Sequence, residues 1–148
     1  METGKLKLII DTREQLPIKF VGATRKTMNV GDYTTDKLHK SFAIERKSPG
    51  DLYGTMLGGH RRFRKEILRA QERGITLVVF VECSRRDFIA KRYPGSERHE
   101  YPSATLQKII ATVSRRYGVK FFWFSGRVKM AGAMLRRLRA EERKLKTK

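Results

Sequence analysis

Residues 42–51 read FAIERKSPGD, and this stretch decides the fold that we expect. Apolar and polar side chains alternate over 41–47, which is the period of a β-strand. The alternation places Glu45 and Lys47 on one face of the strand and Arg46 on the other. A Pro-Gly pair then ends the strand and begins a short helix. We therefore expect a strand whose polar end carries an acid and an amine side by side.

The chain on either side of this stretch alternates between strand and helix patterns. Residues 75–82 form a continuous apolar run, which is typical of a central strand in a parallel sheet. Ser103 is the expected N-cap of a helix that Gly118 ends. The sequence predicts strands over 5–10, 41–47, 75–82 and 119–124, and helices over 51–57, 60–73, 84–93, 103–117 and from 128. This order predicts one α/β domain over residues 1–138 and a frayed, charged tail over 139–148.

The composition indicates a partner that carries negative charge. Among 148 residues there are 34 Lys and Arg but only 15 Asp and Glu, for a net charge of +19. This surplus is self-repelling in the free protein, so nucleic acid is the expected partner; the alternative is a basic surface that binds nothing. The single Cys83 excludes an intramolecular disulfide and a Cys-rich zinc site. No apolar stretch reaches the ~20 residues of a membrane span and no signal peptide is visible, so we expect an intracellular protein, cytoplasmic or nucleoid-associated.

The few acidic residues gather at three points of the chain. Asp11 and Glu14 follow the first predicted strand. Asp32 lies in a turn, 13 positions before Glu45, and a hairpin over this distance would bring the two side chains together. Two carboxylates can hold Mg²⁺, and the Lys47 ammonium beside them can position a water for attack on phosphorus. The other interpretation is an exposed strand face with a cross-strand ion pair.

Three segments occur in a fixed order: IIDTREQ at 9–15, VGDY at 30–33 and AIERKSPGD at 43–51. Together they resemble the XPF-type structure-selective endonuclease family, whose nuclease signature is GD followed by ERKxxxD. The resemblance implies a restriction-endonuclease-like core of the PD-(D/E)xK kind, with a central mixed sheet flanked by helices. It also implies a Mg²⁺- or Mn²⁺-dependent endonuclease that hydrolyses branched, flap or fork-like DNA in DNA repair or recombination.

The same resemblance suggests roles for the acids and for the lysine of these segments. It implies that Asp32 and Glu45, together with Asp11, bind the metal ion. Lys47 is then the residue that assists the attacking water. Glu14 is expected to complete the acidic site.

Two further residues of the signature each have two interpretations. Arg46 either braces the fold or reaches DNA. Asp51 either holds the site from the helix that it begins, or is an acid that the helix dipole favours in a first turn.

The helix predicted over 60–73 is the expected DNA-binding element, because its polar side is mostly basic. The residues that we expect to contact DNA phosphates are Arg61, Arg62, Lys65 and Arg69. The other interpretation is a solvated helix face with ion pairs to Glu66 and Glu72.

The remaining expectations concern the whole protein. The helices predicted over 103–117 and 128–139 carry more apolar surface than one side of a small sheet consumes, and nuclease domains of the resembled family pair, so we expect a homodimer. The sequence shows no tandem helix-hairpin-helix module, and it resembles short stand-alone forms of prophages, viruses or archaea. Two other functions stay open: a basic DNA-binding module with a nuclease fold that does not cleave, and an RNA-binding domain.

Overall fold

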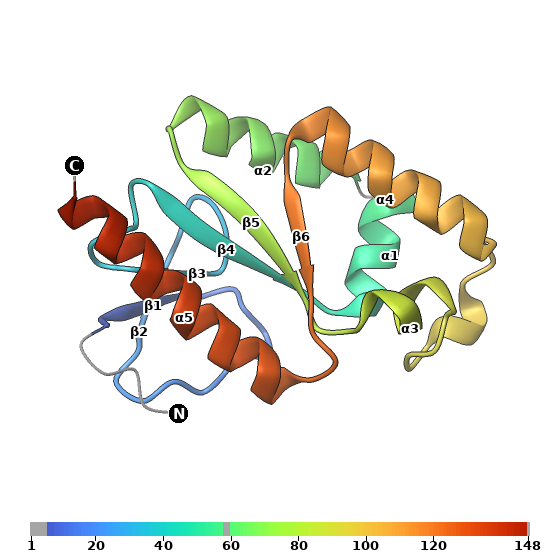
Figure 1. Cartoon of the computed structure of the whole chain (residues 1–148), viewed down its shortest axis with the longest axis horizontal. Helices are drawn as coiled ribbons and strands as arrows, with labels where there is room; N and C mark the ends of the chain where they lie inside the picture. The colour runs from blue at the N-terminus through green and yellow to red at the C-terminus, as the bar shows by residue number, and fades with distance from the viewer. Residues whose placement is uncertain (1–5, 58–59, 148) are drawn as a thin grey trace.

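The structure is a computed structural model, and it describes residues 6–57 and 60–147. Within this part of the chain, six strands form one sheet in the order β2-β1-β3-β4-β5-β6 (Figure 1). The strands are β1 (Leu8–Asp11), β2 (Thr24–Lys26), β3 (Tyr33–Thr35), β4 (Phe42–Lys47), β5 (Thr76–Val81) and β6 (Lys120–Trp123). The helices are α1 (Pro49–Leu57), α2 (His60–Glu72), α3 (Arg85–Ile89), the 3-10 helix η1 (Ser96–Arg98), α4 (Ser103–Tyr117) and α5 (Arg127–Lys146). The predicted α/β class is confirmed.

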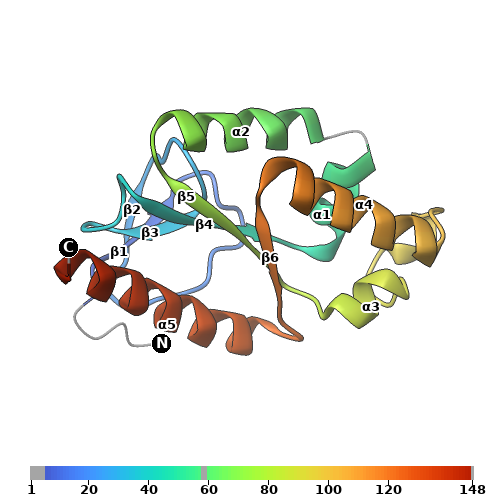
Figure 2. The ribbon, with the colours of Figure 1, turned by 45° about the horizontal axis from the view of Figure 1, so that its top comes forward.

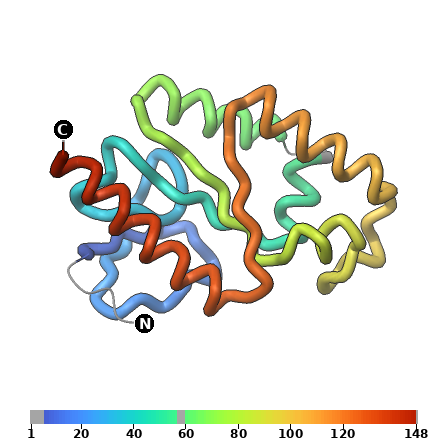
Figure 3. The backbone as a smooth tube through the Cα atoms, in the orientation of Figure 1, coloured from blue at the N-terminus to red at the C-terminus, as the bar shows by residue number. Residues whose placement is uncertain are grey.

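Two kinds of strand pairing meet at β4. β3 runs antiparallel to β1 and to β4, with Tyr33 opposite Ile10 on one side and Ile44 on the other. β4, β5 and β6 run parallel to one another, and the chain crosses from β4 to β5 through α1 and α2, as the tube in Figure 3 traces. The sheet is therefore mixed, as expected. The antiparallel pairing brings the ends of β1, β3 and β4 close together. The parallel pairing of β4 with β5 requires the crossover connection through α1 and α2.

Helices cover both faces of the sheet. The turned view of Figure 2 shows α2 on one side of the sheet and α5 on the other. The core on the α2 side includes Ile9, Ala43, Leu77, Val79, Phe63, Ile67 and Ala70. The core on the α5 side includes Leu8, Ile10, Phe42, Ile44, Phe80, Met130, Met134 and Leu138. Alternate residues of β1, β4 and β5 thus enter opposite cores, which is the pattern that the sequence showed over 41–47.

Four details of the predicted elements were wrong, because neither β2 nor β3 was among the predicted strands and two helix details differ. β2 lies in a stretch without apolar alternation, and all three of its residues are exposed, so the sequence carried no strand signal there. The helix predicted over 84–93 is only α3, five residues long. Ser103 is not an N-cap, because Pro102 holds that position and the Ser103 hydroxyl donates to a backbone carbonyl of α3 at 2.7 Å.

The basic end of the chain is helical. α5 continues to Lys146, so the prediction of a frayed tail over 139–148 is wrong for the described residues. Glu141 accepts from Arg137 at 3.1 Å and from Lys144 at 3.0 Å, and such pairs one turn apart support the end of a helix. Neither α5 nor any other helix among the described residues is long and apolar enough to cross a membrane.

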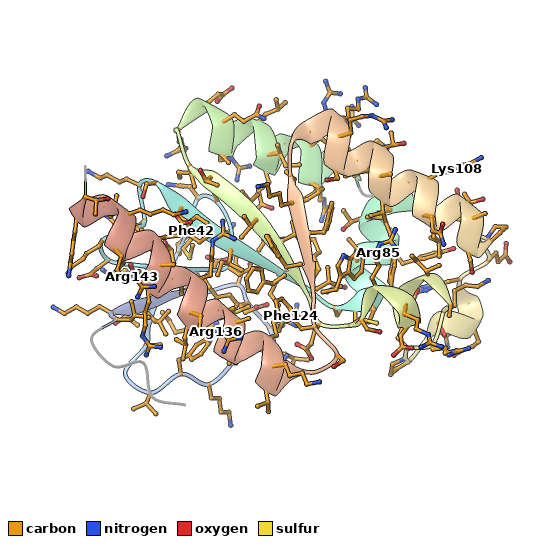
Figure 4. The ribbon with its side chains drawn as sticks, in the orientation of Figure 1. Phe42, Arg85, Lys108, Phe124, Arg136 and Arg143 are labelled. Carbon is orange, nitrogen blue, oxygen red and sulfur yellow. The ribbon has the colours of Figure 1, made fainter. Side chains whose placement is uncertain are left out.

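Most apolar side chains of the last two long helices are buried inside the chain, but Val128 and Leu145 of α5 are exposed. Figure 4 labels Phe42 and Phe124 beside α5. It also labels Arg136 and Arg143 on that helix, and the side chains of these two arginines are exposed. The buried residues of these helices are Leu106, Ile110 and Val113 of α4 and Met130, Ala131, Met134, Leu135 and Leu138 of α5. The two helices pack on opposite faces of the sheet. The apolar surplus that we expected as a reason for dimerisation is therefore small in these helices, and the homodimer stays a prediction.

Candidate active site

The pairing of β1, β3 and β4 brings predicted acids to one end of the sheet. The Asp11 N–H donates to the Asp32 carbonyl at 2.8 Å, and the Asp32 N–H donates to the Ile44 carbonyl at 2.8 Å. Asp32 therefore lies between the ends of β1 and β4, next to Glu45. This confirms the hairpin that the 13-residue spacing predicted.

Asp32 and Glu45 form the centre of the site. The Asp32 carboxylate accepts from the Arg46 N–H at 2.7 Å, and the Glu45 side chain is buried beside it. Burial, and then the neighbouring carboxylates of Glu45 and Glu14, raise the pKa of Asp32 to about 9. Two acids held this close away from bulk water favour a cation or a proton between them.

Lys47 supplies a positive charge on the same face of β4. Its ammonium lies 2.8 Å from the Glu45 carboxylate and 5.6 Å from the centre of the Phe63 ring on α2. Burial alone lowers the pKa of Lys47, but Glu45 raises it, and the net shift is upward. The amine is therefore a fixed cation, and the predicted shared face of Glu45 and Lys47 is confirmed.

Arg46 points to the opposite face, as the strand alternation predicts. Its guanidinium makes a bidentate pair with Glu14 at 2.7 and 3.0 Å, and both side chains are 8% exposed. Its remaining nitrogen lies 3.2 Å from Glu82, which also accepts from Arg127 at 3.0 Å. These ion pairs tie β4 to the loop after β1 and to the start of α5. The geometry supports the bracing interpretation of Arg46. Glu14 is held by this network while its charge still acts on Asp32, and its role in the acidic site stays a prediction.

The Asp11 carboxylate is hydrogen-bonded to neighbouring protein groups, including the segment that precedes β3. Its carboxylate accepts from the Met28 N–H at 2.9 Å and from the Arg13 guanidinium at 3.1 Å. Across residues 6–57 and 60–147, no group of three His, Cys, Asp or Glu side chains converges closely enough to hold a metal ion. Metal ligation by Asp11 stays a prediction, whereas Asp32 and Glu45 are the acids that the structure places together.

A cavity of about 570 Å³ opens between β4, α1 and α2, on the face of β4 that carries Glu45 and Lys47. Its charged lining residues are Glu45, Lys47, Asp51, Arg62, Lys65, Glu66 and Arg69. Three of the four residues predicted to contact DNA therefore share a cavity with predicted catalytic residues. Arg61 is not among the described residues that line it. Asp51 is exposed in the first turn of α1, where its N–H donates to the Ser48 hydroxyl at 3.1 Å, and this position suits both of its interpretations.

Glu66 is a site residue that the sequence analysis missed. Its carboxylate accepts from the Gly31 N–H at 3.1 Å, and burial followed by the charge of Glu45 raises the pKa of Glu66 to about 7. Gly31 has a φ of +74°, and a Cβ there would lie 2.8 Å from the Ala43 Cβ, so glycine is required at this close approach. Glu66 entered the sequence analysis only in the alternative interpretation of this helix, as an ion-pair partner on a solvated face. The sequence signal that could have indicated Glu66 is its spacing. It lies three residues after the buried Phe63, and residues three apart lie on nearly the same face of a helix.

Comparisons with known proteins identify the family. Residues 10–135 match the ERCC4 domain. The chain belongs to the ERCC4 domain family. Two solved structures of XPF from Aeropyrum pernix, one of them in complex with DNA, are similar to it, with TM-scores of 0.64 and 0.63 and identities of 22% and 21%. Each match covers 95% of this chain, which spans about two thirds of theirs (66% and 67%). A comparison with curated proteins found no match.

This membership confirms the resemblance that the motifs suggested. The ERCC4 domain match includes the segments at 30–33 and 43–51 and all but the first residue of 9–15. The similarity to the XPF structures confirms the fold, with its mixed sheet between helices. The chain is thus an ERCC4 domain with the fold of the XPF structures.

The donors of this ERCC4 domain fit a hard divalent cation. Asp32 and Glu45 offer carboxylate oxygens, and burial, followed by the neighbouring carboxylates, raises the pKa of Asp32, so a cation there would stabilise its charged form. Mg²⁺ commonly binds proteins through one or two carboxylates and keeps several waters. The carboxylates of Asp32 and Glu45 therefore suffice for such an ion.

Proposed function

We propose that the chain is a Mg²⁺- or Mn²⁺-dependent endodeoxyribonuclease that cuts branched, flap or fork-like DNA. The observation that carries this proposal is the shared cavity. Glu45, which lies beside Asp32, and Lys47 stand on its β4 side, and the cations of α2 stand on the other. An acidic centre repels phosphates, so it needs a cationic wall to admit a nucleic acid strand.

The side chains in and beside this cavity divide the work. Asp32 and Glu45 would hold the cation, which when bound would neutralise charge on the phosphate and acidify a water. Lys47, fixed by its ion pair with Glu45, orients the attacking water and stabilises negative charge that develops next to it. Arg62 and Lys65 of α2 hold the phosphates of the strand that enters.

DNA as the substrate has two supports. The family is one of DNA nucleases, and one of the similar XPF structures is a complex with DNA. The net charge of +19 supplies the sequence-independent attraction that a phosphate backbone requires.

The test is a cleavage assay with a panel of end-labelled DNAs: single strand, duplex, flap and junction. With Mg²⁺ or Mn²⁺ we expect cuts in the branched DNAs, little cutting of the plain duplex, and none in EDTA. If the protein binds these DNAs but cuts none of them in either metal, the chain is a DNA-binding module with a nuclease fold, and the proposal fails.

A further inference from the structure

A second cavity lies on the same face of the sheet, and its lining residues include neither Asp32 nor Glu45. It measures about 650 Å³, and its floor includes Ile9, Met28 and Val30, all of which are buried. Three cations, Lys26, Lys40 and Arg73, line it as well, and all three are exposed. None of the functions assigned above uses this cavity.

The second cavity adjoins the active-site cavity. Ile9 lies two residues before Asp11 in β1, and Thr34, which also lines the second cavity, lies two residues after Asp32. Because side chains two residues apart share a face of a strand, the cavity floor is roughly 7 Å along the sheet from these acids. This distance is comparable with the spacing of neighbouring phosphates along a single nucleic acid strand.

A hydrogen bond joins the walls of the two cavities. Arg69 lines the active-site cavity, and its guanidinium donates at 2.6 Å to the carbonyl of Asn29, which lines the second cavity. A DNA strand that passes along α2 from Lys65 toward Arg73 therefore meets both cavities in turn.

The chemistry of the second cavity suits one nucleotide. Its buried apolar floor can cover a base, while the side chains of Asn29 and Asp36 at its edge offer a donor and acceptors to the polar atoms of that base. Among the described residues, Lys26, Lys40 and Arg73 form no ion pair, so their charges remain available for phosphates. Three cations against the one carboxylate of Asp36 leave the rim positive.

We propose that this cavity binds one unpaired nucleotide of the DNA substrate, next to the nucleotide whose phosphate is cut. A base inside a duplex is stacked on both sides and cannot enter such a cavity, whereas an unpaired base can. The inference rests on the proposed DNA nuclease function and deepens it. The cavity selects DNA that has a single-stranded segment adjoining the point of cleavage.

The first test compares two DNAs in EDTA, where no cleavage occurs. Binding is measured by fluorescence anisotropy for a fork with two unpaired arms and for a fully paired duplex. The double variant Lys26→Ala/Lys40→Ala should weaken fork binding about tenfold and duplex binding much less. The matched control Lys108→Ala/Lys120→Ala removes the same charge from exposed positions on α4 and β6 and should affect both DNAs equally. Equal losses for fork and duplex in the Lys26→Ala/Lys40→Ala variant would overturn the proposal.

The second test removes single bases from the arm of the fork. An abasic nucleotide at one position beside the junction should weaken binding to the wild-type protein about five- to tenfold, and abasic nucleotides elsewhere in the arm should not. The absence of any sensitive position would refute the nucleotide site even if the fork is cut normally. A wild-type protein that cuts no DNA, yet shows one sensitive position, would instead refute the nuclease function and leave the site standing.

Discussion

The raised pKa of the Asp32 carboxylate predicts that the free energy of unfolding depends on pH. Because its pKa is raised from an ordinary 3.8 to about 9, the folded protein keeps a proton there that the unfolded chain has lost. The free energy of unfolding of the metal-free protein should therefore fall as pH rises through this interval. Asp32→Asn should remove much of that fall, because an amide needs no proton. Urea unfolding at pH 5 and pH 8 in EDTA measures both proteins, and an identical pH dependence would contradict this account.

Arg46 is expected to act through stability. Arg46→Lys keeps the charge but loses the bidentate geometry, so the buried Glu14 carboxylate is left poorly paired, at an expected loss of about 2 kcal/mol. Arg143→Lys, at an exposed position of α5, is the control and should change stability little. Equal unfolding midpoints for Arg46→Lys and the wild type would show that the network with Glu14 and Glu82 does not brace β4.

Sequence patterns predicted the centre of the site better than its surroundings. Alternation along one strand is a local property, so the shared face of Glu45 and Lys47 could be predicted from six residues. The partners of Asp11 and Glu14 could not, because Met28 and Arg46 meet them only through the pairing of distant segments. A carboxylate in a motif can equally hold a loop or a metal ion, and only the fold distinguishes the two.

At the scale of elements, α2 is predicted to be the main DNA contact of the active-site cavity. Arg62→Ala/Lys65→Ala should reduce the slope of log K against log salt by about 1.8, which corresponds to two phosphate contacts. Arg61→Ala/Arg64→Ala removes the same charge from the same helix, but neither residue is among the described residues that line the cavity. A slope that changes equally in both double variants would mean that α2 attracts DNA only by its overall charge.

The elements that the sequence predicted are those with a periodic apolar pattern. β5 is a buried apolar run, and α2 carries a clear apolar stripe, so both appear near their predicted bounds. β2 is short and wholly exposed, and it exists because the β1 edge offers it partners. The end of α5 is too charged to suggest burial, and pairs such as Arg137 with Glu141 support its helix.

At the scale of the whole molecule, the resemblance to XPF-type nucleases predicts a homodimer. β6 forms one edge of the sheet, and its aromatic residues at 121–123 are only partly buried, which leaves apolar area that a second copy could cover. Light scattering at micromolar concentration should report about twice the chain mass of 17.2 kDa. A mass equal to one chain would remove the dimer without affecting the site.

The central claim is that Asp32 and Glu45 bind the metal ion of a DNA nuclease, and one paired experiment tests it. Gel shifts in EDTA and cleavage of branched DNA in Mg²⁺ are compared for the wild type, Asp32→Asn and Glu45→Gln. Each amide removes a ligand charge with little change in volume, so metal-free DNA binding should persist or strengthen, because less negative charge faces the phosphates. Cleavage should fall by orders of magnitude, because the misplaced cation no longer stabilises the transition state. Cleavage by both variants at the wild-type rate would contradict the account.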